Sequence, residues 1–213
     1  MWCRKPIILA FLTGFSLRLL AEPASNDEPT EAARPVNTVL SATVLDGEKV
    51  GQGQDHGVLM YVGGRRLMLI VPQGFRADTT NPEQVAFANP DFSCVLSFRV
   101  AAPGRVAVSS LNASLCRRWL ATRFVNASIL EEFSLTVPSG SGPAFDLICK
   151  VDGVARTSRV AFIASSVGVL EFTSLSSPEK SEVAKVNLRF LLRGLRISGP
   201  NGKFEILPAQ SES

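Results

Sequence analysis

The sequence contains a single histidine among its 213 residues and no pair of cysteines in a C-x-x-C arrangement. These two absences exclude a metal site built from several histidines, a histidine proton relay and a C-x-x-C zinc or redox centre. The one histidine, His56, lies in the glycine-containing stretch 47–57. That stretch lacks G-x-G-x-x-G spacing and a strand-to-helix context, so it does not predict a phosphate-binding loop. We interpret His56 as an exposed loop residue.

Long apolar runs are scarce, and the one that suggests targeting lies at the N-terminus. Arg4 and Lys5 form a short basic start, residues 6–17 are largely apolar, and Ala21 offers a small residue for cleavage. This layout predicts a secretory signal peptide over residues 1–21. The alternative is a membrane anchor, but a spanning helix needs about 20 apolar residues and Arg18 interrupts the run before that. We therefore expect an exported protein, periplasmic or extracellular.

The chain also lacks a large excess of charge. It has 22 Lys+Arg against 19 Asp+Glu, and residues 1–21 contain three of the basic residues (Arg4, Lys5, Arg18) and no acid. The remaining 22 − 3 = 19 basic residues balance the 19 acidic ones. No global field is left to attract nucleic acid, so a nucleic-acid partner is not expected.

Three cysteines remain after residue 21, and an odd number cannot all pair within one chain. Cys94 and Cys149 alternate with apolar residues in strand patterns, and Cys116 lies beside Trp119 in a helical pattern. We interpret all three as buried small hydrophobic residues. A single disulfide among them stays open as an alternative, because export permits one without requiring it.

Composition divides the chain that follows the predicted signal peptide into three parts. Residues 22–36 are acidic, rich in Pro and Ala and without apolar period, which is typical of a flexible linker. Residues 37–207 are long enough and apolar enough to bury the core of a single globular domain. Residues 208–213 are expected to be a disordered tail.

Most of the globular part shows strand patterns separated by tight turns. The sequence Asp152-Gly153 is a strong two-residue hairpin signal, and Gly63-Gly64 and Asn89-Pro90 mark two further turns. Strands that are joined by such turns are antiparallel. The predicted strands are 37–45, 58–62, 66–71, 84–88, 92–100, 129–137, 144–151, 154–164 and 168–174.

Two stretches change to a helical period. The first, over 109–124, is expected to start at a cap on Ser109 or Ser110. It should bury Trp119 and Leu120, with Arg117, Arg118 and Arg123 on its polar face.

The second helix should run from Pro178, after a cap at Ser177, to about Arg196. Together these elements predict an α+β fold with an antiparallel sheet flanked by amphipathic helices on both faces.

The stretch RRLMLIVPQGFR…EQVAFANPDFSCVLSFRVAAP, from Arg65 to Pro103, resembles the opening of PsbP-like domains. There, a strand ends at Pro-x-x-aromatic and is followed by a short strand with a Phe, an Asp-containing turn and an apolar strand. The strand GVLEF at Gly168–Phe172, which leads through Ser176-Ser177 into a final amphipathic helix, extends the resemblance over most of residues 57–198.

The resemblance implies an α/β/α sandwich and a mostly non-catalytic family. That family includes the extrinsic photosystem II protein of the same name, DcrB-type bacterial envelope proteins and a nuclear Ran-binding protein. Some photosynthetic members are associated with metal binding through His and acidic residues. With His56 as its only histidine, this chain does not inherit that role, and we expect no cofactor.

The sequence LMLIVPQGFR contains an abrupt end to a strand. Pro72 has no N–H and ends strand pairing, Gly74 permits a sharp bend, and Phe75 can fold back onto the sheet or helix. We interpret Pro72, Gly74 and Phe75 as a structural corner; a ligand-gripping loop is the alternative.

The expected function is therefore that of an exported binding or accessory protein, not an enzyme, that supports an envelope or membrane-associated complex. The candidate partner-binding residues are Lys185, Arg189 and Arg193 on the last helix, together with His56. A basic helix face suits an acidic protein or, as peripheral association, an anionic lipid surface. The interpretation that the pattern favours is a solvated face whose cations stabilise the C-terminal end of the helix. A secreted hydrolase or transferase with an unrecognised active site is the competing function.

Overall fold

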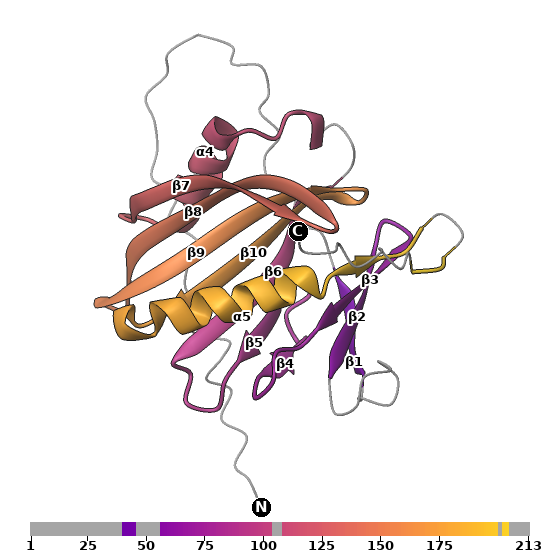
Figure 1. The fold of residues 1–213 in the computed structure, drawn as a ribbon, viewed down its shortest axis with the longest axis horizontal. Coiled ribbons are helices and arrows are strands. Elements are labelled where there is room, and N and C mark those ends of the chain that lie inside the picture. Colours follow the sequence, from indigo (N-terminus) through magenta and orange to yellow (C-terminus); the bar gives the residue numbers. More distant parts are fainter. Residues whose placement is uncertain (1–39, 46–55, 104–107, 200–201, 205–213) are drawn as a thin grey trace, which may run out of the picture.

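The computed structural model describes residues 40–45, 56–103, 108–199 and 202–204 (Figure 1). The predicted signal peptide, linker and tail lie outside these residues, as does most of the loop 47–57. The expected α+β class with antiparallel strands is confirmed, but the described strands form two sheets where the sequence predicted one.

The smaller sheet has four strands in the order β1-β2-β3-β11. All neighbours are antiparallel, and Gly63 and Gly64 form the tight turn between β2 and β3 with positive φ angles. The strands are β1 (Ser41–Leu45), β2 (Gly57–Val62), β3 (Arg65–Ile70) and β11 (Arg196–Ile197).

The larger sheet has seven antiparallel strands in the order β4-β5-β6-β10-β9-β8-β7. The Asp152-Gly153 turn joins β8 to β9 as predicted, and both of its residues adopt positive φ. The strands are β4 (Arg76–Asp78), β5 (Val85–Ala88), β6 (Cys94–Pro103), β7 (Ser128–Val137), β8 (Gly140–Val151), β9 (Val154–Ser165) and β10 (Gly168–Ser176).

The two predicted helices are α4 (Ala113–Arg123) and α5 (Ser181–Arg193), the latter entered through the 3-10 turn η1 (Pro178–Lys180). The predicted cap of α4 was wrong. Asn112, not Ser109 or Ser110, accepts a hydrogen bond from the Leu115 N–H at 2.9 Å. Ser177 precedes the helix as expected but makes no side-chain capping bond.

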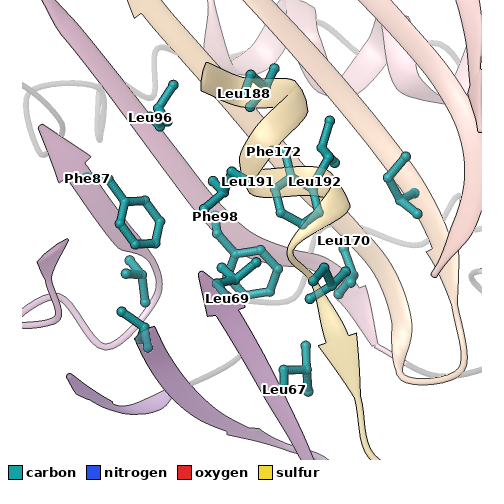
Figure 2. Close-up of a cluster of buried hydrophobic side chains, with 14 of the residues drawn as sticks. Leu67, Leu69, Phe87, Leu96, Phe98, Leu170, Phe172, Leu188, Leu191 and Leu192 are labelled. Atoms are coloured by element: carbon teal, nitrogen blue, oxygen red, sulfur yellow. The ribbon is translucent and has the colours of Figure 1, made fainter. Parts of the chain in front are cut away.

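Helix α5 packs on a core that contains residues of both sheets. Leu188, Leu191 and Leu192 lie beside Phe98 and Phe172 of the larger sheet (Figure 2). The two phenylalanine rings meet edge to face with centroids 5.0 Å apart. Leu67 and Leu69 of the smaller sheet belong to the same buried cluster. Burial of this apolar area is the main stabilising contribution of α5.

Helix α4 packs on a separate buried cluster. Trp119 and Leu120 contact side chains that include Phe145 and Phe162, and the rings of Trp119 and Phe162 lie 5.6 Å apart. Trp119 and Leu120, predicted to be buried, are both buried, and so are the strand and helix residues Leu96, Phe98, Leu147 and Leu191. The periodicity of the sequence therefore assigned the inward faces of these elements correctly.

Candidate functional site on the outer face of helix α5

The corner between β3 and β4 is a tight turn. The Phe75 N–H donates to the Pro72 carbonyl at 3.0 Å, and Gly74 has a φ of +81°, a conformation that favours glycine. Phe75 is buried in the same apolar cluster as α5. Its ring therefore contributes to the core and does not contact solvent as a binding group would.

His56 lies exposed just before β2. Its backbone carbonyl accepts from the Val71 N–H at 2.8 Å, and among the described residues its imidazole has no hydrogen-bond or ion-pair partner. Among the described residues, no hydrogen bond or ion pair joins it to the three basic residues of α5 that were predicted with it. The structure therefore does not bring the four candidate residues together.

Lys185 is tied into a partly buried ionic cluster. Its Nζ lies 3.1 Å from Asp146 Oδ2 on β8 and 2.9 Å from Glu182 Oε1. Arg159 on β9 also binds Asp146, through Nε at 2.6 Å and Nη2 at 2.8 Å, and its guanidinium stacks on Phe133. Lys185 thus joins α5 to the larger sheet, a role that competes with partner binding.

The charges of this cluster reinforce one another. Burial alone would raise the pKa of Asp146, but hydrogen bonds from Arg159 and Lys185 outweigh it and lower that pKa. The Glu182 carboxylate, helped by Asp146, raises the pKa of Lys185. Both groups therefore stay ionised at neutral pH.

Arg189 and Arg193 behave differently from Lys185. Both are exposed, and neither guanidinium forms an ion pair with a described residue. The Arg193 carbonyl accepts a hydrogen bond from Arg196 Nη1 at 2.7 Å, which engages the backbone of Arg193 and not its guanidinium. Within the described part of the chain, these two side chains therefore have no intramolecular partner that would compete with binding.

The outer side of α5 carries a second apolar stripe. Val183, Val186 and Phe190 are 55%, 62% and 45% exposed, and their i, i+3, i+7 spacing places them on one face. Exposed apolar residues that are grouped in this way mark interaction sites. We refer to Val183, Val186, Arg189, Phe190 and Arg193 as the outer α5 surface.

Sequence reasoning missed this second stripe. It predicted an amphipathic last helix and described the outer side of that helix by its basic residues Lys185, Arg189 and Arg193 alone. The spacing of Val183, Val186 and Phe190 was present in the sequence. A projection of the whole helix, rather than of its strongest face, would have revealed it.

A second charged cluster lies beneath α4. Glu171 on β10 is only 1% exposed and binds Arg99 of β6 through Nη2 at 2.7 Å. Arg123, at the end of α4, contacts the other carboxylate oxygen as an ion pair, although its Nη1 has no aligned hydrogen bond. Thr173 donates to Glu171 at 3.2 Å. The prediction that Arg123 lies on the polar face of the helix was therefore wrong.

Burial dominates the electrostatics of this cluster. It lowers the pKa of Arg99 and, together with the neighbouring positive charge of Arg99, lowers that of Arg123 well below the ordinary value. Glu171 is the counter-ion that both guanidiniums share. The cluster ties α4 to the sheet and presents no open carboxylate for acid–base chemistry.

Within the described part of the chain, no three His, Cys, Asp or Glu side chains come together as a metal site. The neighbouring residues Glu131 and Glu132 do not form a carboxylate pair, since Glu132 binds Arg117 at 2.6 Å. No described helix has the length and apolar character needed to cross a membrane.

The three described cysteines are buried and have free thiols. Burial raises the pKa of Cys94 to about 11 and of Cys116 to about 12, and it raises the pKa of Cys149 as well. A thiol that stays protonated is a poor nucleophile. The interpretation of these residues as small buried hydrophobic groups is confirmed.

The sequence matches no family model and no curated protein. Solved structures that resemble the fold include cyanobacterial PsbP (CyanoP) from Synechocystis sp. PCC 6803, at 10% identity and a TM-score of 0.47 over 76% of this chain and 94% of that one. LpqN, involved in cell envelope biogenesis of Mycobacterium tuberculosis, follows at 12% identity and a TM-score of 0.44 over 75% and 92%.

The Saccharomyces cerevisiae Ran-binding protein Mog1p is similar at 9% identity and a TM-score of 0.44, over 73% of this chain and 95% of that one. The PsbP-like resemblance that Arg65–Pro103 suggested is thus found again among solved structures. At such low TM-scores and identities, the partners of these proteins are not transferred to this chain.

Proposed function

We propose that the chain is an exported, non-catalytic binding or accessory protein, and that it binds a protein partner of an envelope or membrane-associated complex through the outer α5 surface. The observation that carries the proposal is the second apolar stripe of α5. A helix that only covers a sheet needs one apolar face, and the exposed Val186 lies on the side of α5 opposite the buried Leu188.

The composition of this surface suits a protein interface. Phe190 offers aromatic area, and Arg189 and Arg193 offer guanidiniums at the rim that form no ion pair with a described residue. Aromatic residues and arginine are enriched at interfaces, where they supply most of the binding energy. Lys185 is left out of the proposed contact set because Asp146 and Glu182 already engage it.

The proposal includes cleavage after residue 21 and one PsbP-like domain over residues 37–207. It also includes the arrangement in which α4 and α5 cover opposite faces of the larger sheet. Along β9, Val160 and Phe162 belong to the cluster of α4, whereas Ala161 and Ile163 belong to the cluster of α5. Successive residues of a strand point to opposite faces, which favours this arrangement.

The test is capture of a partner from the envelope fraction, with a photo-crosslinker in place of Val183 in the tagged mature protein, which leaves position 186 free for substitution. Val186→Glu should abolish the captured species, and Arg189→Glu with Arg193→Glu should weaken capture and its dependence on salt. Val125→Glu is the matched control, because Val125 is also exposed but lies between α4 and β7. Equal capture by the Val186 and Val125 variants would exclude the outer α5 surface.

The non-catalytic part has its own test. Purified mature protein should not turn over ester, glycoside or peptide substrates above the background of a mock purification. Turnover that co-purifies with the protein would overturn it. N-terminal sequencing of the secreted protein, with an expected start at Glu22, tests export.

A further inference from the structure

We propose that a second copy of this chain occupies the outer α5 surface, in an antiparallel pair of α5 helices about a twofold axis. The inference rests on the proposed function, since it requires that this surface binds protein. A second copy is the occupant that best matches the pattern of apolar and charged residues along α5.

The apolar stripe is suited to pair with itself. Val183 and Phe190 lie at its two ends and Val186 lies near its centre, over about 10 Å of helix. An antiparallel pair with its axis beside Val186 places the small Val183 against the large Phe190 of the partner subunit, twice. Each exposed apolar side chain is then covered by another.

The charges of the same face fix the direction of the pair. Glu182, whose side chain is 84% exposed, lies at the start of the helix, and Arg193 lies about three turns later, on the same side of the stripe. In an antiparallel pair, each Glu182 faces Arg193 of the partner subunit. In a parallel pair, each Glu182 would lie level with Glu182 of the partner subunit and far from Arg193 of the partner subunit, so these opposite charges could not pair.

A second copy also fits this face better than a purely acidic partner. An acidic surface would satisfy Arg189 and Arg193 but would repel Glu182, whose only described partner is Lys185 at 2.9 Å. A second copy supplies both signs in the required places. Because the contact is confined to one helix face, its area falls in the range of weak complexes, below about 1,200 Å² in total.

Sedimentation velocity over a concentration series of the mature protein tests the inference. The wild-type chain should change from monomer to dimer with rising concentration, as should the Val125→Glu control. Val186→Glu should stay monomeric with an unchanged melting temperature, because the side chain that it replaces is exposed.

The charge pair gives the sharper test. Glu182→Arg alone and Arg193→Glu alone should each weaken dimerisation about tenfold, since each creates two like-charge contacts across the axis. The double variant Glu182→Arg with Arg193→Glu exchanges the two charges and should restore most of the affinity.

The outcomes separate this inference from the proposed function. Any one of three results overturns the antiparallel α5 pair. The wild-type chain stays monomeric at all concentrations, Val186→Glu still dimerises, or the double variant dimerises no more tightly than the single variants. If capture from the envelope still depends on Val186 while the chain is monomeric, the proposed function stands and this inference fails. If the chain dimerises but capture from the envelope does not depend on Val186, the α5 pair is supported and the proposal of an envelope partner at this surface is contradicted.

Discussion

Helices α4 and α5 carry similar numbers of basic residues but use them in different ways. On α4, Arg123 is turned inward to Glu171 and Arg117 binds Glu132 on the sheet. On α5, Lys185 is engaged in this way by Asp146, whereas Arg189 and Arg193 lie beside exposed apolar residues and form no ion pair with any residue that the structure describes. A basic residue on a helix is therefore not evidence of a partner surface until its own intramolecular partners are known.

The outer sides of the helices differ in the same sense. The side of α4 that faces solvent includes Arg117 and Arg118, which suits contact with water. The side of α5 that faces solvent includes Val186 and Phe190, whose apolar side chains are poorly suited to contact with water. We infer that α4 serves the stability of the domain, whereas α5 serves both its stability and its interactions. The following changes test that division.

Trp119→Ala should have the largest effect, because it removes the main anchor of α4. The indole is buried against Phe162, and truncation of such a side chain costs about 3–5 kcal/mol of unfolding free energy. Urea denaturation followed by circular dichroism measures the loss. A loss below about 1 kcal/mol would mean that α4 contributes little to the core.

Glu171→Gln should lower the free energy of unfolding somewhat less, by about 3 kcal/mol. The amide can still accept hydrogen bonds, but it no longer neutralises the charges of Arg99 and Arg123. The added variant Arg123→Met should recover part of the loss by removing one uncompensated charge. No recovery in the double variant, measured by the same denaturation experiment, would contradict a shared counter-ion.

Asp146→Asn should change the pH dependence of stability. The pKa of Asp146 is lowered in the folded state, so its ionised form stabilises the protein above the unfolded value of about 3.9, and that contribution is lost as pH falls through the folded pKa. The variant should be less stable at pH 7 and should lose less stability on acidification below about pH 4. Thermal melts at a series of pH values measure this, and parallel curves for the two proteins would refute it.

Val186→Ser should have the smallest effect on stability, within about 0.5 kcal/mol, because its side chain is already exposed. Leu188→Ala, on the buried side of the same helix, is the matched comparison and should cost about 2–5 kcal/mol. Similar losses from the two substitutions would show that α5 has no distinct outer side.

The sequence predicted the parts of the fold that depend on local pattern. The hairpin at Asp152-Gly153, the buried face with Trp119 and the helix that follows Pro178 were each predicted from a turn signal or a period. The division of the strands into two sheets was not predicted, because it depends on which distant strands pair. β11 beside β3 and β10 beside β6 are such pairs.

The candidate site was predicted only in part, for a related reason. The exposure of Arg189 and Arg193 follows from the helical period, but the capture of Lys185 by Asp146 depends on how α5 lies across β8. The inward turn of Arg123 likewise depends on Glu171, which comes from a strand that no local pattern connects to α4. Contacts between distant segments decide which charges remain free.

The place of β11 has a consequence for the order in which the chain folds. β11 pairs with β3, and the Ser198 carbonyl accepts a hydrogen bond from Arg65, 133 residues earlier. Synthesis from the N-terminus therefore finishes β1, β2 and β3 long before the strand that completes their sheet is available. Contacts of such high sequence separation form slowly, and an unpaired strand edge on β3 is prone to aggregate in the meantime. A ribosome-bound chain truncated before Arg196 should accordingly remain sensitive to protease in its first hairpin, and release of the complete chain should protect it.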